Sequence, residues 1–298
     1  MGAIEYTEKH ASGALNRVQG MDFKWSLNPY QGCAHDCHYC FARRYHYLMD
    51  LNPDSDFSGS VLIKTNLPEL LTRQVSSPSW KRETIAIGTS TDPYQPIEGK
   101  YRLTRRCLEV LAVRKNPMFL VTKGTLALRD ADLLAQLTRE AEGAVCFSIT
   151  TMDEKIWRKL EPGTPPPRKR LQVLEKLVKS GVNAGVLVAP IVPGVTDDEA
   201  GLSEVVRQAS EHGARFLSGS ILHLKEGTKG HFFNFLKANY PRLVMPYRGL
   251  YPGAYPPRRM KEQVWNTINE LKSTYDLQDR PPRSAAPPPT YQYQMALA

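Results

Sequence analysis

The chain has 298 residues, of which 41% are hydrophobic, and a formal net charge of +9 at pH 7. Its length suits one large domain or two ordinary ones, and no stretch reaches the ~18 uninterrupted apolar residues that a membrane helix needs. Five unevenly spaced cysteines argue against a secreted disulfide framework. We therefore expect a cytoplasmic protein with no membrane partner and no signal peptide.

The positive charge favours an anionic partner, which could be nucleic acid, a phosphorylated metabolite or an acidic membrane surface. A basic surface that only maintains solubility explains the charge equally well. The basic residues occur in short clusters such as "KRE", "TRR" and "PPRRMK", and no run reaches the five or six like charges of a nucleic-acid-binding tail.

Short apolar runs alternate with amphipathic segments from Asp22 to about Leu224. Seven runs are typical of strands. They are residues 23–29, 60–65, 84–90, 118–123, 145–150, 183–190 and 215–224. Helices are expected between them at 67–75, 103–114, 130–142, 169–180 and 198–211. The fourth helix should end at Gly181 in a left-handed conformation, and the fifth should begin with a capping box between Thr196 and Glu199.

This alternation predicts βαβ units, a parallel sheet and an α/β fold. Six or seven units favour a partial or complete barrel over a small open sheet. In such barrels the chemistry lies at the C-terminal ends of the strands. Polar residues gather at those positions in "GTSTD" (88–92), at Lys123, at Ser148 and Thr150, and beside "APIVPG" (189–194).

Four regions are expected along the chain. Residues 1–21 form an N-terminal extension and residues 22–224 form the barrel core. Residues 225–277 contain two amphipathic helices joined by a Pro-, Gly- and Tyr-rich segment. Residues 278–298 are Pro-rich, which predicts a disordered tail.

The segment "GCAHDCHYC" places Cys33, Cys37 and Cys40 in a C-x3-C-x2-C pattern. They could be unrelated free thiols, or a Cys₃His zinc site completed by His35 or His38. Structural zinc sites usually take two separated ligand pairs, and no second pair follows downstream. A third interpretation is a cubic iron–sulfur cluster, in which three thiolates leave one iron with an open coordination position.

The remaining cysteines, Cys107 and Cys146, could in principle supply a fourth ligand. Cys107 lies within a predicted helix and Cys146 within a predicted strand. Buried structural roles are the better expectation for both.

The C-x3-C-x2-C pattern followed by Phe41 resembles the radical S-adenosylmethionine (SAM) superfamily. Six segments from about Ser26 to Ala214 occur in the order of its spore photoproduct lyase-like branch: "NPYQGCAHDCHYCFARRYH", "TSTDPYQPIE", "FLVTKG", "CFSITT", "LEPGTPPPRKRL" and "GVLVAPIVPGVTD". The resemblance implies a partial (β/α)₆ barrel of TIM type, followed here by the helical C-terminal extension. It also implies a 4Fe–4S cluster, SAM, and an electron donor such as flavodoxin or ferredoxin.

Residue by residue, the resemblance assigns the cluster to Cys33, Cys37 and Cys40. Its SAM contacts fall on Phe41, Ser90, Thr91, Lys123, Ser148, Ala189 and Pro190. Lys123 would meet the SAM carboxylate, in a charge-assisted hydrogen bond of about 1.5–3 kcal/mol; the alternative is a surface lysine. The catalytic candidates are Tyr39, Thr89 and Asp92.

Two positions depart from the prototype lyase. Thr89 stands where that enzyme has the cysteine that returns a hydrogen atom, and an O–H bond is a poorer hydrogen-atom donor than a thiol. Phe41 stands where it has a tyrosine of its radical relay, and Tyr39 keeps the other tyrosine. True lyase activity is therefore not expected.

The sequence thus indicates a radical SAM enzyme that forms a 5′-deoxyadenosyl radical and abstracts hydrogen from an unidentified substrate. Basic charge and kinship favour a nucleic acid or nucleotide. The alternatives are modification of a peptide or small metabolite, and a zinc-stabilised nucleic-acid-binding module without catalysis. Glu161 and residues 168–170 could line the substrate side, begin a helix or lie on a solvated face.

Overall fold

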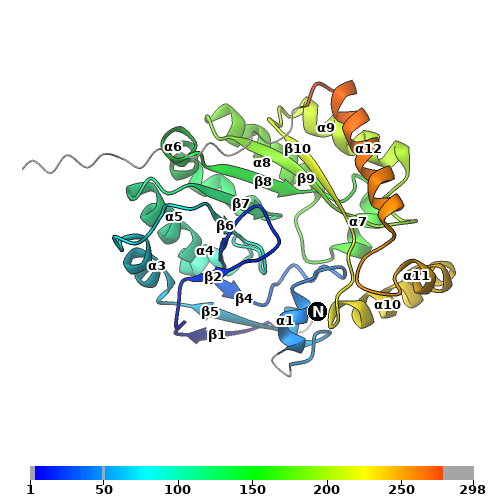
Figure 1. The fold of residues 1–298 in the computed structure, drawn as a ribbon, viewed down its shortest axis with the longest axis horizontal. Helices are drawn as coiled ribbons and strands as arrows, with labels where there is room; N and C mark the ends of the chain where they lie inside the picture. The colour runs from blue at the N-terminus through cyan, green and yellow to red at the C-terminus, as the bar shows by residue number, and fades with distance from the viewer. Residues whose placement is uncertain (1–3, 49–50, 278–298) are drawn as a thin grey trace, which may run out of the picture.

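The computed structural model describes residues 4–48 and 51–277. Six parallel strands form its curved central sheet, in the order β3, β6, β7, β8, β9, β10 (Figure 1). They are β3 (Trp25–Leu27), β6 (Ile85–Ile87), β7 (Met118–Thr122), β8 (Ala144–Ser148), β9 (Ala184–Ile191) and β10 (Leu217–Ile221). The sheet ends at β10 on one side and at the antiparallel β2 (Leu15–Arg17) on the other. It is therefore an open, partial (β/α)₆ barrel, and the predicted fold class is confirmed.

Five amphipathic helices pack against the sheet and bury their apolar faces in one continuous core. They are α3 (Leu67–Val75), α5 (Leu103–Val113), α6 (Ala131–Ala141), α8 (Pro167–Lys179) and α9 (Glu199–Glu211). Leu171, Leu174 and Leu177 of α8 are fully buried, and each such side chain contributes about 1.5–3 kcal/mol. All five helices were predicted, with ends shifted by no more than two residues.

The local signals at two helix ends had different outcomes. Gly181 has a φ of 85° after α8, so the left-handed position is confirmed. The capping box before α9 is wrong, because the carboxylate of Asp198 caps the helix by accepting from the backbone N–H of Gly201 at 2.8 Å. The Thr196 hydroxyl instead accepts from the backbone N–H of Val192.

One predicted strand lies outside the barrel. β5 (Ser60–Lys64) pairs with β1 (Glu5–Lys9) and β4 (Tyr30–Gln31) in a separate three-stranded sheet. Only its alternate side chains, Val61 and Ile63, are fully buried, as in a sheet with one covered face. By contrast, β8 is buried along its whole length. Because β5 pairs with β1 and β4, the barrel has six units and not seven.

The C-terminal extension contains α10 (Thr228–Asn239), α11 (Val244–Leu250) and α12 (Arg258–Thr274). Both predicted helices are present, and α11 forms in the segment that was expected only to link them. Helix α12 packs on β10 and α9, whereas α10 lies beside α1 (Arg43–Tyr47) (Figure 1). Among the described residues, no helix is both long and apolar enough to span a bilayer. The tail predicted to be disordered, 278–298, lies outside the described residues.

Candidate functional site

The three cysteines of the C-x3-C-x2-C pattern occupy the loop between β4 and α1, here called the cysteine loop (residues 32–42). Consecutive turns wind this loop: the Cys40 N–H donates to the Cys37 carbonyl at 3.2 Å, and the Arg43 N–H donates to the Cys40 carbonyl at 3.2 Å. Gly32 starts the loop with a φ of 82°, and a Cβ there would lie 2.4 Å from the Ser60 carbonyl oxygen. The start of the loop therefore requires glycine.

The three thiols are free, and those of Cys33 and Cys37 are buried. Burial raises the pKa of Cys33 to about 12 and holds the pKa of Cys37 well above its ordinary value, and the charge on Cys40 would raise both. Three thiolates this close together are unfavourable unless a cation neutralises them. A bound metal centre supplies that charge and deprotonates its thiol ligands. The donor set therefore fits the thiolate ligation of an iron–sulfur cluster.

The segment after β6 fixes the start of the cysteine loop. The Thr91 hydroxyl donates to the Gly32 carbonyl at 2.6 Å, and the Gln95 side chain accepts from the Ala34 N–H at 3.0 Å. Gln95 is fully buried and also donates to the Thr91 hydroxyl. Thr91 was predicted to contact SAM, but its hydroxyl donates to the backbone of the cysteine loop. Sequence reasoning missed Gln95.

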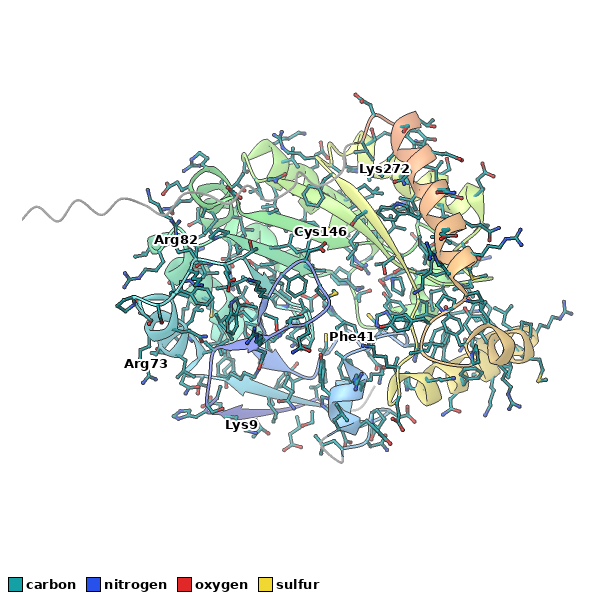
Figure 2. The ribbon with its side chains drawn as sticks, in the orientation of Figure 1. Lys9, Phe41, Arg73, Arg82, Cys146 and Lys272 are labelled. Atoms are coloured by element: carbon teal, nitrogen blue, oxygen red, sulfur yellow. The ribbon has the colours of Figure 1, made fainter. Side chains whose placement is uncertain are left out.

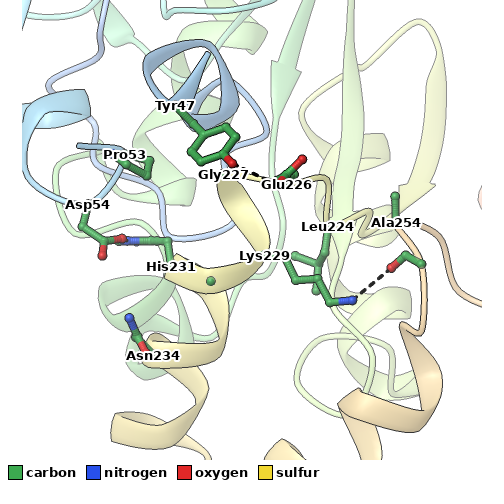
Figure 3. Close-up of a pocket in the computed structure, with 12 residues that line it drawn as sticks. Tyr47, Pro53, Asp54, Leu224, Glu226, Gly227, Lys229, His231, Asn234 and Ala254 are labelled. Carbon is green, nitrogen blue, oxygen red and sulfur yellow. Dashed lines mark hydrogen bonds and ion pairs between the residues drawn. The ribbon is translucent and has the colours of Figure 1, made fainter. Parts of the chain in front are cut away.

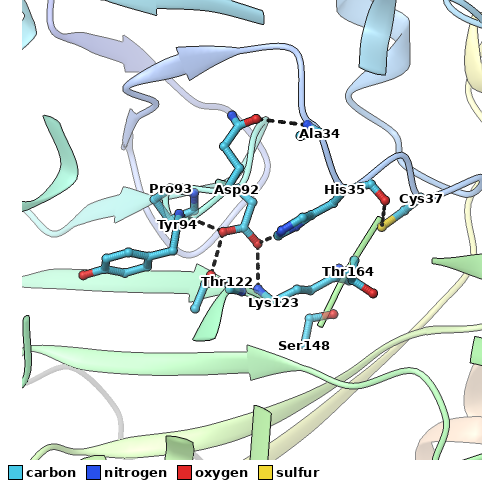
Figure 4. A network of polar contacts seen from close by, with 12 residues as sticks. Ala34, His35, Cys37, Asp92, Pro93, Tyr94, Thr122, Lys123, Ser148 and Thr164 are labelled. Carbon is cyan, nitrogen blue, oxygen red and sulfur yellow. Dashed lines mark hydrogen bonds and ion pairs between the residues drawn. The ribbon is translucent and has the colours of Figure 1, made fainter. Parts of the chain in front are cut away.

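Asp92 links the cysteine loop to the end of β7 (Figure 4). Its carboxylate accepts from the Thr122 hydroxyl and the Lys123 N–H, both at 2.6 Å, and lies 3.2 Å from Nδ1 of His35. Burial alone would raise the pKa of Asp92, but His35 and these hydrogen bonds outweigh burial and hold the pKa below its usual value. Asp92 is thus placed as a charged positioning group. Its catalytic role stays a prediction.

Lys123 follows β7 and points toward the cysteine loop. Its Nζ lies 5.6 Å from the centre of the Tyr39 ring. Burial would lower the pKa of Lys123, but Cys37 and Glu161 raise it above its usual value, so the ammonium group is charged. The alternative of a surface lysine is wrong, because this cation faces the site. An anionic ligand group there would meet a charged donor.

A buried ion pair between the end of α7 and α8 anchors the cysteine loop through Tyr39. Glu161 ends α7 (Glu154–Leu160) and pairs with Arg170 of α8, and both side chains are at most 1% exposed. The Tyr39 hydroxyl donates to the same carboxylate and lies 3.2 Å from the Thr150 hydroxyl. Burial opposes ionisation of Glu161, yet Arg170 and Lys123 lower its pKa to about 2. The solvated face considered for Glu161 and Arg170 is therefore wrong.

The turn after Glu161 also contacts the cysteine loop. The Gly163 N–H donates to the His35 carbonyl at 3.1 Å, and the His38 N–H donates to the Leu160 carbonyl at 3.0 Å. A Cβ on Gly163 would lie 2.3 Å from the Ala34 carbonyl oxygen. This close approach requires glycine at position 163.

The other predicted SAM contacts lie at the ends of β8 and β9. The Ser148 and Thr150 hydroxyls donate to the Ala189 carbonyl, at 2.8 and 3.3 Å. Ala189 and Pro190 are half-buried. The structure brings these residues to the same edge of the sheet, and their SAM contacts stay predictions.

Thr89 and Ser90 follow β6 and are half-buried. One side chain, Asn28, contacts both: its amide nitrogen lies 3.5 Å from the Thr89 hydroxyl, and its oxygen accepts from the Ser90 N–H at 2.9 Å. Asn28 is buried at the end of β3 and was missed by the sequence analysis. A polar residue directly after a short strand is common, so the sequence around Asn28 did not indicate a role in the site.

Phe41 starts a row of rings that leads away from the cysteine loop. Figure 2 labels Phe41 near the C-terminal helices. Its ring centre lies 5.7 Å from that of His223, which follows β10, and His223 stacks on Tyr255 at 5.7 Å. Tyr255 is 51% exposed and carries the Lys261 ammonium 4.5 Å from its ring centre. Sequence reasoning missed His223 and Tyr255.

The basic charge is concentrated beside this row of rings. Residues 225–261 contain one acidic residue, Glu226, and eight basic ones, a formal charge of +7 within the chain's +9. The basic residues are Lys225, Lys229, Lys237, Arg242, Arg248, Arg258, Arg259 and Lys261. Their spacing in the sequence concealed this strongly basic segment, residues 225–261, here called the basic extension.

The sequence profile of the Radical SAM superfamily matches residues 27–204. The chain belongs to this superfamily. Radical SAM proteins are enzymes that use a 4Fe–4S cluster and SAM, so the predicted enzyme class and cofactors are confirmed. The matched region begins at the end of β3 and extends into α9, and it contains the cysteine loop, Lys123 and the Glu161–Arg170 pair.

Several curated proteins are similar to this radical SAM chain. An uncharacterized protein of Mycobacterium tuberculosis (H37Rv) is 37% identical over 278 residues, which covers 92% of this chain and 82% of the relative. An uncharacterized protein of Methanocaldococcus jannaschii is 27% identical, covering 80% and 85%. A protein of Pseudomonas phage M6 named radical SAM Nalpha-GlyT isomerase is 27% identical, covering 65% and 39%.

Solved structures of spore photoproduct lyase share the fold. One mutant form gives a TM-score of 0.69 at 16% identity and covers 91% of this chain and 79% of that chain. Another, with bound AdoMet and dinucleoside spore photoproduct, gives 0.69 at 15% identity with the same coverage. At this identity the likeness shows the fold, which is that of spore photoproduct lyase, as expected from the sequence.

Proposed function

We propose that Cys33, Cys37 and Cys40 hold the cluster at which this enzyme cleaves SAM, and that the substrate is a nucleic acid or nucleotide. The observation that carries the first part is the presence of three free thiols in one loop, two of them buried, facing the charged Lys123. The loop is fixed from two sides, by Thr91 and by the segment after Leu160.

When bound, the cluster and SAM supply one electron and a 5′-deoxyadenosyl radical that abstracts hydrogen from the substrate. The chain's own residues bind SAM and hold the cysteine loop in position. Lys123 offers a charged donor to the SAM carboxylate, where such a bond is worth about 1.5–3 kcal/mol. Gln95 holds the backbone of the cysteine loop, Asp92 holds the Lys123 N–H, and Tyr39 anchors the loop to Glu161.

The aromatic row and the basic extension support a nucleic-acid substrate. Tyr255 and Phe41 flank His223 at the edge where the strands end, and each base stacked on an aromatic ring contributes about 1–3 kcal/mol. The basic residues of 225–261 can neutralise phosphates. A small apolar metabolite would use neither feature.

The proposed reaction is not repair of the spore photoproduct. Thr89 stands at the end of β6 without a thiol to return a hydrogen atom. Incubation with dinucleoside spore photoproduct, SAM and dithionite should therefore yield no catalytic amount of thymine dinucleotide by liquid chromatography. Multiple turnovers would show that this chain is a lyase after all.

The test of the enzymatic proposal is release of 5′-deoxyadenosine by the anaerobically reconstituted protein with dithionite and SAM. Cys37→Ala should abolish the release. Cys107→Ala, which alters a core thiol outside the cysteine loop, should retain it. Equal release from both variants would contradict the ligand assignment. Colourless protein with one zinc per chain would instead support the non-catalytic zinc module.

The substrate is tested by deuterium transfer. Perdeuterated DNA and RNA should transfer deuterium into 5′-deoxyadenosine, as measured by mass spectrometry. Transfer only from a deuterated peptide or metabolite pool would contradict the nucleic-acid proposal and leave the SAM chemistry intact. A cytoplasmic location is part of the proposal, because a cluster on three free cysteines requires reducing surroundings.

A further inference from the structure

A pocket lies at the edge of the sheet where the parallel strands start. Its walls come from the end of β2, the start of β3 and the loop before β6, and its volume is about 310 Å³. The cysteine loop contacts the opposite edge, through Thr91 after β6 and Thr150 after β8. Figure 2 labels Arg82, in the loop before β6, well away from Phe41. This cavity, here called the strand-start pocket, is therefore separate from the SAM side of the barrel.

Two tryptophans line the strand-start pocket. The ring centres of Trp25 and Trp80 lie 5.5 Å apart, with the ring planes tilted by 55°. The Trp25 indole N–H donates to the Glu83 carboxylate at 2.6 Å, and the Trp80 indole N–H donates to the Asn116 side chain at 2.7 Å. Both rings are half-buried and pack against the core. Because each indole N–H is already bound, the rings are held in place and offer a ligand their apolar faces.

The charged side chains around these two rings are mostly basic. Three basic residues and one acidic residue line the pocket, a formal charge of +2: Arg17, Lys24, Lys81 and Glu83. Lys24 pairs with Glu83 at 2.7 Å. Arg17 and Lys81 are exposed, and neither side chain forms a hydrogen bond or ion pair with a residue that the structure describes. The pocket therefore combines aromatic faces with two cationic groups that are available to an anion.

The larger groove between α1 and α10 lacks this combination (Figure 3). It has a volume of about 570 Å³, but its charged side chains are engaged within the chain. Asp54 pairs with His231, Glu226 accepts from the Tyr47 hydroxyl, and Lys229 donates to backbone carbonyls. This groove therefore favours no charged class of ligand, whereas the strand-start pocket favours an aromatic anion.

We propose that the strand-start pocket binds a nucleotide, with the base on the indole faces of Trp25 and Trp80 and the phosphate on Arg17 and Lys81. Every base has a face that stacks on an aromatic ring, and both cations bind phosphate. A volume of about 310 Å³ lies within the range of small-ligand pockets. The nucleotide is either free or one unit of a single strand. The proposal goes beyond the proposed function, because this pocket requires neither the cluster nor SAM.

The first test is a fluorescence titration of the full chain, because two of its four tryptophans line the pocket. Thymidine 5′-monophosphate should quench the tryptophan emission, and thymidine, which lacks the phosphate, should bind at least tenfold more weakly. Lys81→Glu keeps both indoles and should weaken binding of the monophosphate about tenfold at low salt, and less at high salt because ions screen exposed charges. Lys176→Glu makes the same charge change on the exposed face of α8 and should bind normally. Equal affinities of Lys81→Glu and the unaltered chain would overturn the proposal.

The second test removes a stacking ring and measures binding of the monophosphate by isothermal titration calorimetry. Trp80→Leu keeps an apolar side chain against the core, and loss of the aromatic face should weaken binding about tenfold. Trp80→Phe keeps a ring and should retain most of the affinity, which separates stacking from a folding defect. Trp265→Leu removes an indole that is 45% exposed on α12 and should bind normally. Unchanged affinity in Trp80→Leu would show that no base stacks in this pocket.

The source of the nucleotide is tested by comparing the monophosphate with tetrathymidylate. Binding of the strand at least tenfold more tightly, with the same loss in Lys81→Glu, identifies a unit of a single strand, and equal affinities identify a free nucleotide. Tyr255→Ala alters the ring row beside Phe41 and should leave the Lys81→Glu effect intact. Failure of the proposed function looks different. In that case nucleic acids transfer no deuterium into 5′-deoxyadenosine, while the effects of Lys81→Glu and Trp80→Leu on nucleotide binding remain.

Discussion

The Tyr39 hydroxyl donates a hydrogen bond to the carboxylate of Glu161, a residue 122 positions further along the chain. Tyr39 lies between two cysteines of the cysteine loop, whereas Glu161 ends α7, which follows β8 much later in the chain. Through Arg170, the same carboxylate is tied to α8. The geometry of the cysteine loop therefore depends on a buried charge that the loop does not contain.

Glu161→Gln should destabilise the protein strongly. The substitution leaves Arg170 buried without its partner, and breaking a buried pair in this way costs about 3–5 kcal/mol. Urea unfolding of the metal-free chain measures the loss. The control is Glu175→Gln, which breaks an exposed pair with Lys179 and should give no measurable change. Equal stabilities of both variants would contradict the structural role of Glu161.

The same carboxylate should make stability depend on acid pH. Its pKa is lowered from 4.5 to about 2 in the folded chain, so its contribution is fully present above pH 4.5 and is lost as the pH falls toward 2. The full loss corresponds to about 3 kcal/mol. In urea unfolding between pH 3 and pH 6, Glu161→Gln should therefore show a shallower pH dependence than the unaltered chain. Identical slopes would mean that Glu161 does not titrate as described.

Lys123→Met should weaken SAM binding about 10- to 100-fold, because it removes a charged donor from the site. Equilibrium dialysis with radiolabelled SAM and reconstituted enzyme measures the affinity. Lys176→Met, on the exposed face of α8, should bind SAM normally. Iron content must stay unchanged in both variants, which separates loss of a SAM contact from loss of the cluster. Normal SAM affinity in Lys123→Met would rule out its assigned role.

Tyr255→Ala should weaken binding of single-stranded DNA by about 1–3 kcal/mol, since it removes one stacking surface. The salt dependence should stay the same, because no charge is removed. Lys261→Glu should reduce that dependence. Trp265→Ala removes an aromatic ring on α12 that is 45% exposed and lies outside the row, and it should bind DNA normally. Fluorescence anisotropy at several salt concentrations distinguishes these outcomes.

The barrel was predictable because its strands are short apolar runs separated by helices with a clear apolar face. Fully buried strands such as β8 and helices such as α8 carry that signal in their own residues. The placement of β5 was not predictable in this way. Its residue pattern predicts a strand, but the pattern does not indicate that this strand pairs with β1 and β4. That pairing depends on how the whole chain folds.

The cysteine loop and Lys123 were found because their residue types and spacing are specific. Glu161 and Arg170 were not recognised as a buried pair, because charged residues near a Pro-rich turn normally face solvent. The signal was present in "EPGTPPPRKR": a tight turn between the two residues can bring their side chains together. Gln95 and His223 carried no such signal, since their roles arise only when distant segments meet.

The central claim is that three cysteines hold a four-iron cluster with one iron left for SAM. Mössbauer spectroscopy of the anaerobically reconstituted, ⁵⁷Fe-labelled protein tests it most directly. We expect about four irons per chain, with the signal of one iron site changing when SAM is added. No bound iron, or four iron sites that all stay unchanged with saturating SAM, would contradict the account.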